Sequence, residues 1–254
     1  MLVDTHCHLN LIEEFPDPAA EVDYARREGV DRQIVIGIDL PTSRYALELA
    51  EQFPDVYASS GIHPNSTADL SADWLDQLRD MLRHPNCVAL GEVGLDYHWD
   101  FSPPVQQKQA LEAQLDLAEE LHMPVVLHCR KAYGDLLDLL ESRRPAAPLV
   151  FHCFSGTSDD AGRAGDLEAY FGVDGPLTYK NASELREIVR ILPRDRVLIE
   201  TDAPYLTPVP HRGKPNRPAY VKWVNEMLAS LWHISPEECG QITTQNAERF
   251  FGLP

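Results

Sequence analysis

The chain has 254 residues, 44% of them hydrophobic and 24% charged, and no apolar run reaches the roughly 18 residues of a transmembrane helix, so we expect a soluble globular protein. Its formal net charge of −18 argues against tight, sequence-independent binding of duplex nucleic acid, which needs a basic surface. A short single strand, a chain end or a small anionic substrate fits this charge better.

Short β-rich apolar runs alternate with longer amphipathic segments, a pattern typical of a parallel sheet with crossover helices. We predict eight strands, at residues 2–8, 33–38, 56–61, 88–92, 125–128, 149–152, 169–172 and 197–201. Because no linker, repeat or low-complexity tract interrupts the pattern, we predict one domain over residues 1–254, folded as an α/β protein of the (β/α)8 or TIM-barrel class.

Several helices have recognisable ends in the sequence. Asp17 before a proline predicts an N-cap, and Gly29 predicts the end of the same helix. An apolar stripe over residues 111–121 predicts a helix that stops at the following Met-Pro. Ser235, followed by Pro-Glu-Glu, predicts a capping box for the last helix, which should end near residues 250–252.

The segment 203–218 is the one long irregular stretch, and it contains five of the twenty prolines. It directly follows the eighth predicted strand. Because the chemistry of α/β barrels lies at the carboxyl ends of the strands, we expect this segment to be an active-site loop.

Six histidine and carboxylate side chains fall at the predicted carboxyl ends of five different strands. They are His6, His8, Glu92, His128, His152 and Asp202. Any one of them alone is more simply read as a hydrogen-bonded core residue, a cap or an ion-pair partner. Together, four imidazoles and two carboxylates without a thiolate predict a site for divalent cations such as Zn²⁺, Mn²⁺ or Mg²⁺.

The residue types suggest how such a site would work. Glu92 has two oxygens and is the natural bridge between two cations about 4 Å apart, which would activate a water as nucleophile. Asp202 would hold one ion and accept a proton from that water. Glu200 lies two residues earlier and points to the same face, either as a proton-relay group or as a structural ion-pair partner.

Other residues on the same rim are candidates for substrate binding. His63 follows the third strand and either binds a phosphate or fixes its own loop, and Lys180 and Arg212 lie on later loops, where they would meet an anion or remain solvated. Tyr97 and Trp99 follow the fourth strand and either stack on a base or pack a loop.

The N-terminus, MLVDTHCHLN, has no basic or apolar leader, so we expect a cytoplasmic protein. Five cysteines form no CxxC pair, which indicates reduced thiols. Cys7, Cys129 and Cys153 each stand beside a predicted ligand histidine, and strand alternation predicts that they face the helices.

The chain resembles the TatD family of metal-dependent deoxyribonucleases, within the amidohydrolase superfamily. The resemblance covers nearly the whole chain and rests on the ordered segments DTHCHL, GIHP, GEVGLDYHWD, PVVLHCRKA, FHCFSG, LIETDAPYL, RGKPN and TTQNAERFFGL. It implies a (β/α)8 barrel with two divalent cations on the six residues above, and hydrolysis of nucleic-acid phosphodiesters, often as a 3′-to-5′ exonuclease. Two departures, Lys131 and Arg217, replace usual acidic residues and add positive charge near the rim.

Three functions follow from these observations. The first is hydrolysis of DNA phosphodiesters at single-stranded ends. The second keeps the same two-metal site but cleaves an ester or amide, such as a D-aminoacyl-tRNA. The third is a metalloprotein that only binds a partner, which metal-dependent hydrolysis would eliminate. The sequence leaves the native metal and the oligomeric state open, and a monomer is compatible with it.

Overall fold

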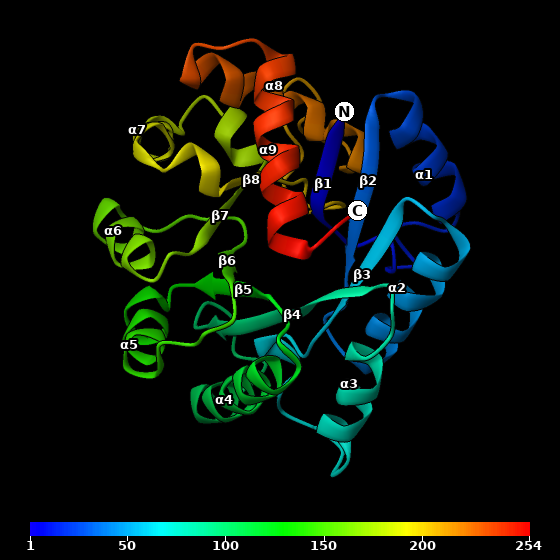
Figure 1. Ribbon diagram of the computed structural model, residues 1–254, viewed down its shortest axis with the longest axis vertical. Coiled ribbons are helices and arrows are strands. Elements are labelled where there is room, and N and C mark those ends of the chain that lie inside the picture. The colour runs from blue at the N-terminus through cyan, green and yellow to red at the C-terminus, as the bar shows by residue number, and fades with distance from the viewer.

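A computed structural model describes residues 1–254 and contains eight parallel strands in the order β1 to β8, surrounded by helices (Figure 1). The strands are β1 (Leu2–Cys7), β2 (Val30–Ile36), β3 (Val56–Ser60), β4 (Cys87–Asp96), β5 (Val125–Arg130), β6 (Leu149–Phe151), β7 (Tyr170–Val173) and β8 (Val197–Ile199). The helices are α1 (Pro18–Arg27), α2 (Leu40–Gln52), α3 (Trp74–Leu82), α4 (Pro104–Leu121), α5 (Tyr133–Arg143), α6 (Ser158–Asp166), α7 (Ser183–Ile191), α8 (Val221–Trp232) and α9 (Pro236–Phe251). The predicted (β/α)8 barrel is confirmed.

The predicted helix ends are found in the structure. The Asp17 side chain accepts a hydrogen bond from the N–H of Ala20, and Gly29 follows α1 with a φ of +86°. The Ser235 side chain accepts from the N–H of Glu238 at the start of α9. None of the helices is both long and apolar enough to cross a membrane.

The barrel closes where β1 meets β8. The N–H of His8 donates to Ala203 and that of Asp202 to His6, each over 2.8 Å. Beneath this seam the buried Asp4 carboxylate accepts from the backbone N–H of Thr201 (2.8 Å) and from its hydroxyl (2.6 Å). These bonds fix the ends of β1 and β8, which both carry predicted ligands.

The interior of the barrel has its own apolar core, distinct from the larger core between strands and helices. It is formed by Val3, Ile34, Ile36, Ala89, Val126, Val150, Tyr170 and Leu198 together with Ala247, Phe250, Phe251 and Leu253 from α9 and its end. The α9 residue Asn246 also binds the carbonyl of Val197, at the amino-terminal start of β8. Helix α9 thus closes the amino-terminal end of the barrel, and only the opposite end is left for a site.

Two irregular strands turn ligands into the barrel. Val3 and Ala89 point inward, so strict alternation would turn His6, His8 and Glu92 outward. The pairing register shifts between Asp4 and Cys7 in β1 and between Leu90 and Val93 in β4, which reverses the alternation in both strands. The sequence expectation that Glu92 ends its strand is wrong, because β4 continues to Asp96.

Candidate metal centre

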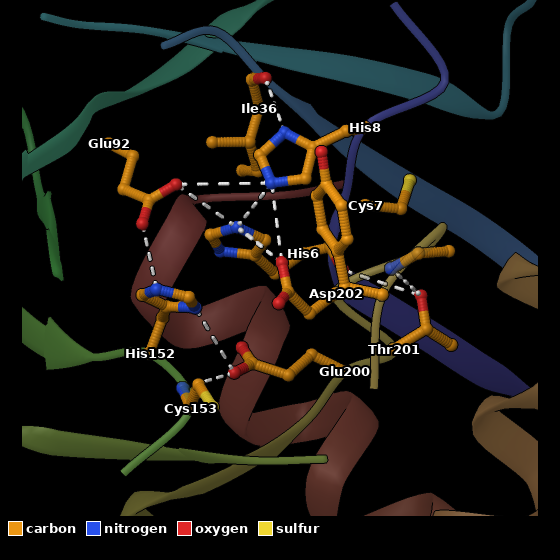
Figure 2. Close-up of polar contacts among 12 residues, drawn as sticks. His6, Cys7, His8, Ile36, Glu92, His152, Cys153, Glu200, Thr201 and Asp202 are labelled. Atoms are coloured by element: carbon orange, nitrogen blue, oxygen red, sulfur yellow. Dashed lines mark hydrogen bonds and ion pairs between the residues drawn. The ribbon is translucent and has the colours of Figure 1, made fainter. Parts of the chain in front are cut away.

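The six predicted ligands converge at the carboxyl end of the barrel. His6, His8, Glu92, His152 and Asp202 are buried, and His128 is largely so. Figure 2 shows one carboxylate oxygen of Glu92 facing His8 and the other facing His152. Each strand except β2, β3 and β7 therefore supplies a ligand or leads directly into one.

A first group of side chains surrounds one oxygen of Glu92. Its Oε2 lies 3.5 Å from Nε2 of His6 and 3.9 Å from Nε2 of His8. Oδ1 of Asp202 lies 3.6 Å from the same atom of His6 and 3.3 Å from that of His8. Two imidazole nitrogens and two carboxylate oxygens thus face a common space.

The second group surrounds the other oxygen. Oε1 of Glu92 lies 2.7 Å from Nδ1 of His128 and 2.8 Å from Nε2 of His152. His63 adds a nitrogen 3.6 Å from the same oxygen. One carboxylate is therefore shared by two sets of nitrogen donors.

The tautomers of two imidazoles test whether the site fits a cation. His8 can donate from Nδ1 to the carbonyl of Ile36 (3.1 Å), and His128 from Nε2 to Asp96 (3.0 Å). In the neutral rings, Nε2 of His8 and Nδ1 of His128 then carry lone pairs that face the carboxylate oxygens. Nε2 of His8 also lies 3.2 Å from Nε2 of His6, and Nδ1 of His128 lies 3.3 Å from Nε2 of His152. Converging nitrogen and oxygen lone pairs are the donors that a divalent cation coordinates, so the residues present fit divalent metal ions.

The charge state of the Glu92 carboxylate also fits a site for divalent cations. Burial by itself raises the pKa of Glu92, but the surrounding imidazoles outweigh burial and hold that pKa well below its usual range. Glu92 is therefore anionic at neutral pH, as a metal ligand would need to be.

Glu200 lies beside the cluster rather than inside it. Its Oε1 accepts from the N–H of Cys153 (2.5 Å) and lies 3.7 Å from Nδ1 of His152 (Figure 2). The carboxylate occupies the space left by Gly172, where a Cβ would come within 2.5 Å of Oε2. The bond to Cys153 connects β8 to the turn after β6, and the Glu200 carboxylate faces the ring of His152.

Comparison with known proteins identifies the family. The family described as "TatD related DNase" matches residues 3–252. The chain belongs to the TatD family. It is 41% identical over 254 residues to the "Uncharacterized metal-dependent hydrolase YabD" of Bacillus subtilis, which covers all of both chains.

Two further TatD relatives extend the comparison. The "3′-5′ ssDNA/RNA exonuclease TatD" of Citrobacter rodentium is 36% identical, over 89% of this chain and 88% of that protein. The crystal structure of YJJV, a TatD homologue from Escherichia coli, superimposes with a TM-score of 0.94 at 33% identity, covering 100% of this chain and 98% of the other. The protein is a metal-dependent hydrolase of the TatD family, with the fold of its solved relatives.

The centre of this TatD protein opens into a cavity of about 740 Å³. His63 lines it, whereas the other two predicted substrate-binding residues, Lys180 and Arg212, do not. The guanidinium of Arg212 lies 4.0 Å over the ring of Tyr179. Substrate binding by Lys180 and Arg212 therefore remains a prediction, and neither residue lines the cavity.

The departures from the TatD pattern also lie outside the cavity. Arg217 forms two hydrogen bonds with Glu21 on α1, of 2.7 and 2.9 Å, and covers Tyr24. Its charge is therefore paired rather than free at the rim. Lys131 is exposed just after β5.

The cysteine expectation is confirmed only in part. Cys7 and Cys129 belong to the core between strands and helices. Cys129 also lines the cavity, as does Cys153, which is absent from that core because the chain turns after β6 with a positive φ of 44° at this residue. Alternation along a strand no longer applies once the strand has ended.

Asp96 is the functional residue that the sequence reasoning missed. Its Oδ2 binds Nε2 of His128, and its Oδ1 accepts from the N–H of His98 (2.8 Å) and of Trp99 (3.3 Å). The signal was present in the run Gly-Glu-Val-Gly-Leu-Asp, but the predicted strand stopped at Glu92 and left Asp96 in a loop. Tyr97, also considered for base stacking, donates its hydroxyl to Asp135 and packs against the outer core.

Proposed function

We propose that the protein hydrolyses phosphodiester bonds of DNA at single-stranded ends, as a 3′-to-5′ exonuclease. The observation that carries this proposal is the position of Glu92, which shares its two oxygens between two groups of donors at the base of a cavity. Two cations held in this way suit in-line displacement at phosphorus. The exonuclease name of the Citrobacter rodentium relative supports the choice of substrate.

Each group of donors would hold one cation, of Mg²⁺, Mn²⁺ or Zn²⁺. One set is His6, His8, Asp202 and Glu92, and the other is His128, His152 and Glu92. When bound, such ions neutralise charge on the phosphate and acidify water. Asp202 faces the cavity and would accept the proton of the attacking water.

His63 would contribute as a neutral hydrogen-bond donor. Burial and the neighbouring His128 lower the pKa of His63 to about 3, so the ring carries no charge at neutral pH. Its Nδ1 accepts from the N–H of Asn65 (3.1 Å), which leaves the proton on Nε2. That N–H points toward Glu92 and would donate to an oxygen of the phosphate or of the leaving group.

The test is an assay on single-stranded DNA labelled at either end, with Mg²⁺, Mn²⁺ or Zn²⁺ and a chelator control. A 3′-to-5′ exonuclease releases labelled mononucleotide at once from the 3′-labelled strand and shortens the 5′-labelled strand stepwise. We expect Glu92→Ala and Asp202→Ala, if folded, to lose on the order of 10³-fold or more in rate. Near-normal rates in either variant, or cleavage that survives the chelator, would contradict the proposal.

The same experiment should include RNA and a D-aminoacyl-tRNA as competing substrates. Both reactions need the same metal ligands, so only the relative rates with one metal separate them. Faster deacylation than DNA cleavage would move the assignment to ester hydrolysis and leave the metal centre intact.

A further inference from the structure

We propose that Trp99 and Phe101 form a stacking site for a nucleobase of the strand whose phosphate occupies the metal centre. This inference rests on the proposed function and extends it to a place for the base. Trp99 lines the same cavity as Glu92 and His128.

Trp99 and Phe101 are unusually exposed for aromatic side chains. Trp99 is 47% exposed and Phe101 is 64% exposed, whereas the other three tryptophans are buried or partly buried. The two rings stack on each other, with centroids 5.7 Å apart and planes inclined by 27°. Two adjacent aromatic rings left in water, one of which lines the cavity of the candidate metal centre, indicate a surface that a ligand covers.

A positive charge lies beside the aromatic pair. Arg130 is the only lysine or arginine that lines the cavity, and its guanidinium lies 5.7 Å from the centre of the Trp99 ring. A cation beside stacked aromatic rings is the combination with which proteins bind single strands, since the rings take bases and the cation takes the backbone. Because the chain has a net charge of −18, a cation placed beside the rings favours an anionic nucleic-acid strand over an apolar peptide as the ligand.

Hydrogen bonds connect the stacking site to the candidate metal centre. The same Asp96 carboxylate binds the ring of His128 and the backbone N–H of Trp99. The Gln107 side chain binds the N–H and the carbonyl of Asp96 and the carbonyl of Ser102, so it holds both ends of the loop that carries the aromatic pair. A base on Trp99 would therefore be held at a defined position relative to the ligands.

The decisive variants are Trp99→Ala, Trp99→Phe and the double variant Trp99→Ala/Phe101→Ala. Ile191→Ala serves as the control, because Ile191 is 69% exposed on α7 and does not line the cavity. Binding is measured by fluorescence anisotropy with a labelled oligonucleotide of non-cleavable phosphorothioate linkages. Cleavage is measured on an ordinary strand and on a matched strand with abasic sugars at its 3′ end.

We expect the double variant to bind the phosphorothioate oligonucleotide about 10-fold or more weakly than the wild type. The affinity of Trp99→Phe should lie between the two, and that of the control should be unchanged. The KM of the double variant should rise on the ordinary strand, whereas on the abasic strand it should match the wild type. Equal binding by all variants, or an equal loss on both strands, would overturn the stacking site. If the wild type cleaves neither strand, the proposed function fails, but the binding comparison still decides the stacking site.

Discussion

His128 shows how one proton position prepares a metal ligand. Its ring has Asp96 on one side, at 3.0 Å, and Glu92 on the other, at 2.7 Å. A hydrogen bond from Nε2 to Asp96 keeps the proton away from the cluster, so Nδ1 is available to a cation. Asp96 is thus a positioning residue, and it acts through the tautomer of its neighbour.

We expect Asp96→Asn to weaken metal binding by about 10- to 100-fold, because the amide is a poorer acceptor and can turn its NH₂ group toward the ring. The measurement is the dissociation constant of Zn²⁺ or Mn²⁺ by competition with a chelator. Asp100→Asn is a matched control, because Asp100 is exposed on the same loop. An affinity equal to that of the wild type would show that Asp96 does not position His128.

Gly172 supports a different ligand by having no side chain. A Cβ here would lie 2.5 Å from Oε2 of Glu200, so Gly172→Ala must displace a buried carboxylate. We expect a loss of about 1 to 3 kcal/mol in the free energy of unfolding, measured with urea, together with reduced activity. Gly165→Ala in α6, where no atom lies within 4 Å of the new Cβ, should be neutral or stabilising. Equal effects of the two substitutions would contradict the role of Gly172.

At the level of elements, irregular strands decide which way the ligands point. The register shifts in β1 and β4 turn His6, His8 and Glu92 inward, whereas His128 and His152 follow the regular alternation from Val126 and Val150. Bulges of this kind commonly lie next to active sites, where they re-aim side chains.

Helix α9 is the element that completes the inside of the barrel. Phe250 is buried there, with its ring 5.0 Å from that of Tyr170. We expect Phe250→Ala to cost about 3 to 5 kcal/mol in the free energy of unfolding. The control is Gln241→Ala on the exposed side of the same helix, and both are measured by chemical denaturation. A loss below about 1 kcal/mol in the Phe250 variant would mean that the inner core repacks without the ring.

The sequence was sufficient to predict the barrel and the convergence of the six candidate ligands, for different reasons. The alternation of strands and helices reflects burial, which composition and periodicity report directly. The ligands were found from their chemistry and their common position along the barrel, although simple alternation from Val3 or Ala89 would have turned three of them outward. A register shift depends on pairing with neighbouring strands, so it leaves little trace in the sequence. The contact of Asp96 with His128 and the position of Lys180 and Arg212 outside the cavity also depend on how distant parts of the chain pack. They therefore could not be predicted without coordinates.

At the scale of the whole molecule, the acidic surface limits how a nucleic acid can bind. Because Arg130 is the only lysine or arginine that lines the cavity, few phosphates are contacted by permanently charged side chains. We expect the logarithm of the binding constant for a single strand to fall with the logarithm of salt concentration with a slope of about −1 to −2. Anisotropy titrations at several KCl concentrations measure this slope, and Arg130→Ala should make it shallower by about 0.7. A slope steeper than about −4 would indicate that the strand contacts an additional basic surface outside the cavity.

Helix α9, which closes the amino-terminal end of the barrel, also affects how the chain folds during synthesis. Val3 is translated almost at once, but its inner-core partners from Ala247 to Leu253 follow all eight strands. At about 5 to 20 residues per second, the first strand waits on the order of 10 to 50 seconds for that cover. Until α9 is synthesised, the aliphatic side chains that the strands contribute to the inner core lack their cover at the amino-terminal end of the barrel.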